Sequence, residues 1–244
     1  MATPDETTCR STEENFSRRR ADVDWSAFLV FRCIVGSQAC GLSRENSDVD
    51  RRGVYLPPAD LHWSLDGVPQ SYAVDEIQAL YWELQRFLTL ALQANPTVLE
   101  CLFSPLAEPL TAVGERLLAL RGCFLSRRLS ASYEGCLISE LKRIERCRKN
   151  QSRVPWKKAM HLLRKVRFGT RLLRDRTGVL EVGADRDRLL EIRDGMVSWA
   201  DYVQELESAR GELSQAAVAS TLPAEPNREA VGCFLIDARR SAVR

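Results

Sequence analysis

The sequence predicts an α+β protein, with strands in the first half of the chain and helices in the second. Residues 27–35 and 50–56 are rich in β-branched and aromatic side chains, and each run ends at glycine or proline. From residue 133 onward, apolar residues recur at the three- and four-residue spacing of packed helices. With 244 residues, of which 45% are hydrophobic and 28% charged, the chain has the composition of an ordinary globular protein.

Three parts follow one another along the chain. Residues 1–24 are polar, charged and without periodicity, which predicts a poorly ordered tail. Residues 25–125 contain the predicted strands and form the first predicted domain. Residues 126–244 form a predicted helical domain, with the boundary placed at Gly122 and the Ser/Arg-rich run that follows it.

A glycine-serine turn follows the first predicted strand. Gly36 allows the backbone to approach a ligand closely, and Ser37 offers a hydroxyl and an amide N–H where a short helix could begin. This turn therefore predicts a seat for an anionic phosphate.

Two aspartates in alternation introduce the second predicted strand. The two-residue period of a strand directs Asp48 and Asp50 to one face and Val49 into the core. Neighbouring carboxylates repel each other unless a cation lies between them, and Mg²⁺ binds through one or two carboxylates plus the phosphates of its substrate. An isolated Asp-x-Asp is more often a polar turn. Its spacing from the Gly-Ser turn favours a metal-dependent nucleotide site.

A helix is predicted at residues 82–94, where apolar side chains follow the helical spacing. It must end before Pro96, because proline disfavours a helical conformation in the residue before it. Asn95 is predicted to cap the next helix, with Glu100 in the first turn of that helix, where its charge would complement the helix N-terminus. A functional role for Glu100 is an equal alternative.

Positive charge is concentrated between residues 140 and 176, which hold 14 Lys or Arg and 3 acids, although the whole chain carries only +2. Such a segment attracts polyanions such as RNA, DNA or a triphosphate, although a solvated helix surface is an alternative. Five residues share one predicted helix face in this segment: Lys157, His161, Arg164, Phe168 and Arg171. We expect Lys157 and His161 to face the cleft and bind the triphosphate or the acceptor.

The cysteine and hydropathy patterns exclude several classes. Eight cysteines are scattered without a C-x-x-C pair, and only two histidines are present, so a zinc site is not expected. We see no apolar stretch approaching 18 residues and no signal-like start, so we expect no membrane partner and a cytoplasmic location. A P-loop motif is absent from the sequence.

Four segments resemble one known family. A strand, Gly-Ser, about ten residues, Asp-x-Asp and a second strand form the pattern of the DNA polymerase β superfamily of nucleotidyltransferases. The match extends to the predicted nucleotidyltransferase family called RlaP, named for bacterial RNA-repair gene clusters. The resemblance covers roughly residues 27–240 and depends on the segments GSQACGLSRENSDVDRRGVYLPP, LALQANPTVLECLFSPL, WKKAMHLLR and PNREAVGCFLID.

The resemblance implies a minimal nucleotidyltransferase fold, a mixed sheet with flanking helices, followed by a helical domain. It also implies three metal-facing acids, of which Asp48 and Asp50 are two. The third is expected from a neighbouring strand within residues 72–81. Glu76 is preferred as the third acid, and Asp75 is nearly as good. If Gln78 occupies the equivalent position instead, the third acid is missing.

The predicted reaction is metal-dependent transfer of a nucleoside monophosphate from an NTP such as ATP to an acceptor hydroxyl, for which an RNA end is one candidate. Asp48, Asp50 and Glu76 would hold Mg²⁺ or Mn²⁺, with two ions about 3.5–4 Å apart. Gly36 and Ser37 would hold the phosphates.

Two other functions are compatible with the sequence. A catalytically weak or inactive nucleotide-binding sensor or adaptor is one, because the third acid is uncertain. A metal-dependent phosphodiesterase that uses the same carboxylates is a weaker alternative.

Overall fold

The computed structural model describes residues 23–45, 47–151 and 153–243. The predicted tail, residues 1–24, lies outside this range except for its last two residues. Its final residue, Asp24, caps a short 3₁₀ helix, η1 (Trp25–Phe28), by accepting a hydrogen bond from the Ser26 amide.

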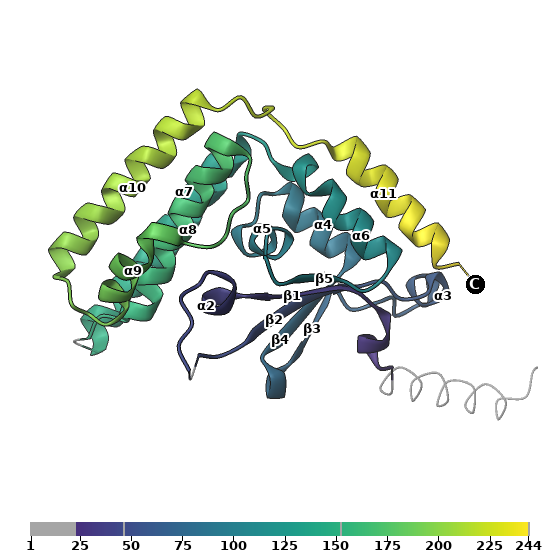
Figure 1. Cartoon of the computed structure of the whole chain (residues 1–244). Coiled ribbons are helices and arrows are strands. Elements are labelled where there is room, and N and C mark those ends of the chain that lie inside the picture. The colour runs from purple at the N-terminus through teal and green to yellow at the C-terminus, as the bar shows by residue number, and fades with distance from the viewer. Residues whose placement is uncertain (1–22, 46, 152, 244) are drawn as a thin grey trace, which may run out of the picture.

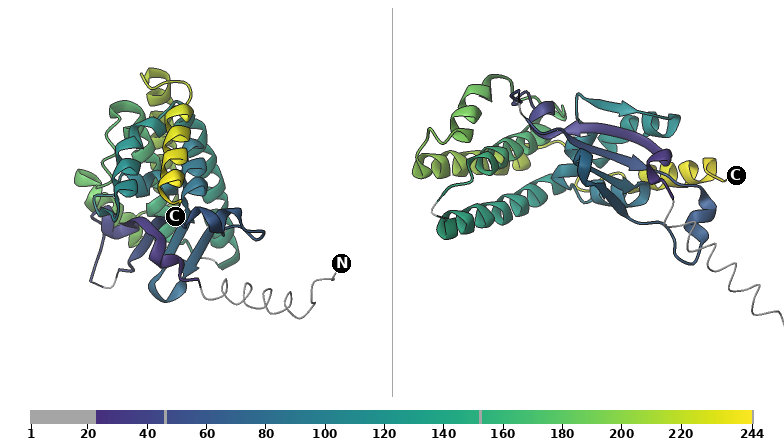
Figure 2. Two further views of the ribbon diagram at one scale, coloured as in Figure 1. Left: turned by 90° about the vertical axis from the view of Figure 1, so that its right-hand side faces the viewer. Right: turned by 90° about the horizontal axis from the view of Figure 1, so that it is seen from below.

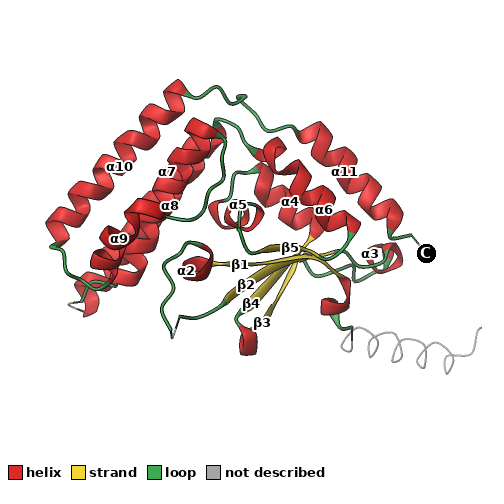
Figure 3. Ribbon diagram, in the orientation of Figure 1, coloured by secondary structure: helices red, strands yellow, loops and turns green. Residues whose placement is uncertain are grey.

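A five-stranded mixed sheet forms the centre of the first half, in the order β3-β4-β2-β1-β5 (Figure 3). Its strands are β1 (Leu29–Val35), β2 (Asp50–Tyr55), β3 (Ser71–Val74), β4 (Ala79–Glu83) and β5 (Ala107–Pro109). The pair β2–β4 is parallel, and the other pairs are antiparallel. The predicted α+β class with a mixed sheet is confirmed.

Three helices pack on one face of this sheet (Figure 1): α4 (Leu84–Leu92), α5 (Pro96–Leu102) and α6 (Ala112–Ala119). The predicted cap at Asn95 is confirmed, since its side chain accepts hydrogen bonds from Thr97 and Val98. Two further short helices lie in connections, α2 (Gly36–Ala39) after β1 and α3 (Ala59–Trp63) after β2.

The second half of the chain is helical, as predicted. Its helices are α7 (Arg128–Gln151), α8 (Trp156–Asp175), α9 (Arg186–Arg193), α10 (Trp199–Ala219) and α11 (Arg228–Ser241). Seen from below, α7, α8 and α10 extend to one side of the sheet, whereas α11 lies at the other end (Figure 2). There α11 returns to the first half, where Asp237 pairs with Arg116 of α6 at 3.1 Å. No helix in the described ranges is long and apolar enough to cross a membrane.

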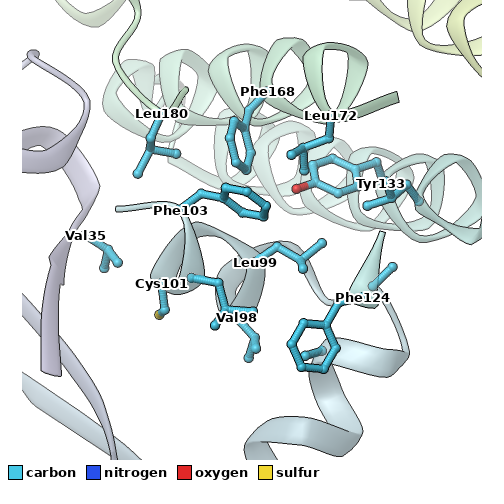
Figure 4. Packing of buried hydrophobic residues seen from close by; sticks show 14 of the residues in the cluster. Val35, Val98, Leu99, Cys101, Phe103, Phe124, Tyr133, Phe168, Leu172 and Leu180 are labelled. Atoms are coloured by element: carbon cyan, nitrogen blue, oxygen red, sulfur yellow. The ribbon is translucent and has the colours of Figure 1, made fainter. Parts of the chain in front are cut away.

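One continuous hydrophobic cluster joins the two halves, from Val30 in β1 to Ala238 in α11. Where α5 meets α7 and α8, Phe103 and Phe168 pack edge to face, and Leu99 and Tyr133 lie beside them (Figure 4). The prediction that five residues of α8 form one cationic face is wrong for two of them. Phe168 and Arg164 are buried, because this side of α8 packs against α5.

Candidate functional site

The Gly-Ser turn and the second aspartate are in direct contact. Asp50 begins β2 and is paired in register with Val35, the last residue of β1. Gly36 then starts α2 with a φ of +70°, and a Cβ on Gly36 would lie 2.6 Å from Asp50 Oδ2. Only glycine combines this conformation with this space. Ser37 follows and is buried.

Lys157, the second residue of α8, reaches the first aspartate. Its Nζ lies 3.2 Å from Asp48 Oδ2, and the two side chains are 53% and 55% exposed. A pair this exposed contributes at most about 1 kcal/mol, so Lys157 can exchange its partner at little cost. The structure thus brings the Gly-Ser turn, both aspartates and the start of α8 together.

His161 lies one helical turn after Lys157 and is half-buried. Burial, together with the nearby cations Arg164, Lys165, Lys157 and Arg193, lowers its pKa to about 3. The imidazole is therefore neutral at neutral pH, so it can offer a hydrogen bond but no positive charge.

This neutral imidazole predicts an acid sensitivity of the fold. An unfolded histidine titrates near ~6.5, so between that pH and a folded pKa of about 3 only the unfolded chain binds the proton. Stability must then fall as the pH drops below about 6.5. Between pH 7 and pH 5, wild type is expected to lose roughly 2 kcal/mol more free energy of unfolding than His161→Gln. Urea denaturation at both pH values measures this difference, and an equal loss in the two proteins would contradict it.

The helical half also holds the backbone that follows α2. The Arg193 guanidinium donates to the Leu42 carbonyl at 2.9 Å, and the Arg186 guanidinium donates to the Gly41 carbonyl at 3.0 Å. Arg44 completes the attachment through an ion pair with Asp194 at 2.6 Å. Residues 41–44 are therefore attached to the helical half by three side-chain contacts.

The sequence predicted Glu100 in the first turn of α5, and this prediction is wrong, because Glu100 lies in the second turn. It is buried and pairs with Arg164 of α8 at 2.8 Å, with side-chain exposures of 7% and 2%. Burial raises the pKa of the Cys40 thiol, at the end of α2, to about 11, while Arg164 lowers this pKa and Glu100 raises it. Sequence reasoning missed this pairing. Its only signal was an arginine on the same helix face as Phe168.

The two acids proposed as the third ligand lie in the connection between β3 and β4. Asp75 and Glu76 are exposed in a 3₁₀ turn, η2 (Asp75–Ile77), that joins β3 to β4, and no described contact links either of them to Asp48 or Asp50. In the described part of the chain, no three Asp, Glu, His or Cys side chains are grouped to hold a metal ion. Glu76 as a metal ligand stays a prediction.

The predicted basic segment divides into two kinds of residue. Some of its cations serve the interior or neighbouring helices, such as Arg164, Lys165 and Arg167, which pair with Glu100, Glu140 and Glu205. Others are exposed and have no ion pair among the described contacts: Lys142, Arg143, Arg146, Lys149, Arg153 and Lys158. This second group, in the second half of α7, the connection after it and the start of α8, is termed the basic track. Its last residue, Lys158, directly follows Lys157 in the chain.

The mixed sheet, the glycine turn beside paired aspartates and the helical second half define a DNA polymerase β-like nucleotidyltransferase fold. Residues 11–236 match the family model described as "RNA repair pathway DNA polymerase beta family", RlaP, and the chain belongs to this family.

A more distant similarity is found to the uncharacterized protein YcgL of Bacillus subtilis (strain 168). The two are 29% identical over 89 residues, which cover 35% of this chain and 34% of YcgL. No solved structure matches the chain.

Proposed function

We propose that this protein is a metal-dependent nucleotidyltransferase that moves a nucleoside monophosphate from an NTP to an acceptor hydroxyl. The observation that carries the proposal is the contact between the Gly36 turn and Asp50, with Asp48 and Lys157 beside them. Family membership supports the same class of reaction.

The donor set fits a hard divalent cation that arrives with its nucleotide. Asp48 and Asp50 offer carboxylate oxygens, and Mg²⁺ or Mn²⁺ commonly completes its coordination with substrate phosphates and water. Such an ion supplies positive charge against the phosphate oxygens and lowers the pKa of a bound hydroxyl.

The residues of the chain supply positioning. In the reaction, the acceptor oxygen bonds to the α-phosphorus, the α–β phosphoanhydride bond breaks, pyrophosphate leaves, and the hydroxyl proton is released to solvent. Lys157 would transfer its ion pair from Asp48 to a phosphate of the NTP, and the Gly36–Ser37 backbone would approach another. Neutral His161 would add a hydrogen bond. Fixed groups of this kind lower the barrier because they are already oriented.

The basic track favours a polyanionic acceptor, with an RNA end as the first choice. Its cations have no acidic partners among the described residues, so they are available to phosphates along a strand. Phosphate contacts of this kind give salt-dependent affinity without reading sequence.

Transfer of label from each α-³²P NTP, with Mg²⁺ or Mn²⁺, onto separate pools of RNA, DNA and protein tests the function. Label on one pool, with release of pyrophosphate, is the expected result and identifies the acceptor class. Cleavage of nucleic acid in the absence of NTP would instead favour a phosphodiesterase.

The position of Glu76 favours a second candidate, a nucleotide-binding sensor without turnover. Glu76 lies in a turn, with no described contact to the aspartate pair. Metal-dependent NTP binding without pyrophosphate release on any acceptor pool would support this function over transfer.

Gly36→Ala should disable the site while the protein stays folded. The left-handed conformation costs an alanine roughly 1–2 kcal/mol. The new Cβ, 2.6 Å from Asp50 Oδ2, must also displace the carboxylate. A displacement of about 1 Å can cost on the order of 10²-fold in rate, so transfer should fall by that factor. Gly41→Ala is the matched control, because Gly41 has a φ of +72° with nothing within 4 Å of its Cβ. Equal loss of transfer in both variants would contradict the contact.

A further inference from the structure

Gln78 stands level with Asp50 in the sheet. The register of the parallel strands pairs Arg51 of β2 with Ala79 of β4, and the Arg51 amide donates to the Gln78 carbonyl at 3.2 Å. One residue earlier, Asp50 is therefore flanked by Val35 of β1 on one side and Gln78 on the other. A third carboxylate on the strand next to Asp50 would have to occupy the position of Gln78.

The backbone conformation places Asp75 and Glu76 in the turn before Gln78 and not at the position beside Asp50. Gln78 has a left-handed φ of 50°, and its amide donates back to the Asp75 carbonyl at 3.1 Å, which closes η2. Asp75 and Glu76 thus belong to the exposed turn and not to the ladder beside Asp50. The residue beside Asp50 is therefore Gln78, whose side chain is an uncharged amide.

Arg52 lies between the two residues. In a strand, Asp50 and Arg52 point to the same face. The Arg52 guanidinium places Nη2 3.5 Å from Asp50 Oδ1, while its Nη1 donates to the Gln78 carbonyl at 3.2 Å and to its neighbour's carbonyl, that of Arg51, at 2.7 Å. Its side chain is only 19% exposed. These bonds hold a fixed positive charge on the β4 side of Asp50.

We propose that the site binds a single divalent ion with each nucleotide, and that Asp48 and Asp50 hold this ion. A second ion would need a carboxylate at position 78, and the guanidinium of Arg52 supplies a fixed positive charge in its place. This inference rests on the proposed function and specifies its metal requirement. An arginine keeps its charge at all relevant pH values and needs no third acid to hold it. The site would then be complete with two aspartates.

Equilibrium dialysis of the whole chain against Mn²⁺ and the α,β-methylene analogues of the four ribonucleotides, one at a time, tests the inference. The quantity measured is Mn²⁺ bound per nucleotide bound. We expect a ratio of one for wild type, Asp75→Asn and Glu76→Gln. The double variant Arg52→Gln/Gln78→Asp exchanges the fixed charge for a third carboxylate, and its ratio should rise to two.

A wild-type ratio of two, or a lower ratio in Glu76→Gln, would overturn the inference and assign a second ion to the site. A ratio of one in a double variant that binds nucleotide would overturn the placement of Gln78. Since the double variant could fail to fold, wild type and Glu76→Gln decide the ion count without it. Absence of nucleotide binding in wild type would overturn the proposed function itself, which separates that failure from this one.

Discussion

Asp48→Asn and Asp50→Asn are each expected to reduce nucleotidyl transfer by on the order of 10²–10³-fold, the usual loss when one fixed electrostatic group is removed from a reaction site. Asparagine keeps the shape of the side chain and one oxygen but loses the negative charge. Because the two aspartates act on the same phosphates, the double variant should lose little more than the worse single variant. Label transfer under the conditions that give wild-type product measures all three.

The loss should come from chemistry and not from unfolding. The Asp48–Lys157 pair is more than half exposed, so its loss should cost at most about 1 kcal/mol of stability. Asp237→Asn is a matched control. Asp237 pairs with Arg116 at 3.1 Å with 52% and 48% exposure, on the far side of the molecule. Wild-type transfer in Asp237→Asn and a greatly reduced rate in Asp48→Asn, at similar denaturation midpoints, is the expected pattern. Full transfer in the double aspartate variant would eliminate the proposed reaction.

Local patterns were sufficient to predict the first two strands and their turn. Residues 27–35 and 50–56 carry continuous β-branched and aromatic runs, and the structure has β1 and β2 within them. The Gly-Ser turn follows directly from the end of β1. In the second half, helical spacing placed Lys157 correctly at the start of a long helix.

The third-acid segment could not be resolved by the same means. Residues 72–81 read as one neighbouring strand, but they contain the end of β3, the turn η2 and the start of β4. Which residue lies beside Asp50 depends on the parallel register of β4 with β2, and that register pairs residues 28 positions apart in the chain, such as Arg51 and Ala79. Sequence periodicity holds no information on such a register, so it could support a preference for Glu76 but could not decide between Glu76, Asp75 and a position filled by Gln78.

Domain limits were predicted at residue 125, close to the start of α7 at Arg128. The return of α11 to the first half was not foreseen. Its amphipathic spacing predicts a helix but does not indicate which surface covers its apolar side. The division at residue 125 stays a prediction, and a shared core spans it.

Separating Glu100 from Arg164 should produce the largest loss of stability. Glu100→Gln leaves the arginine charge buried without its partner, and breaking a buried pair in this way typically costs about 3–5 kcal/mol. Two other nitrogens of Arg164, Nε and Nη1, already lack a hydrogen-bond partner among the described residues, so nothing nearby can replace the carboxylate. Chemical denaturation should therefore show a large decrease in the unfolding midpoint. Glu108→Gln, which breaks the exposed 2.7 Å pair with Arg32, should cost under about 1 kcal/mol.

The double variant Glu100→Leu/Arg164→Met distinguishes a structural role from a chemical one. Because it removes both charges together, it should recover much of the stability lost in Glu100→Gln. If the pair serves only to hold α8 against α5, transfer should recover with stability, since Lys157 and His161 return to their positions beside the aspartates. Restored stability without restored transfer would instead place Glu100 or Arg164 in the chemistry of the site. That outcome would decide the alternative that the sequence left open for Glu100.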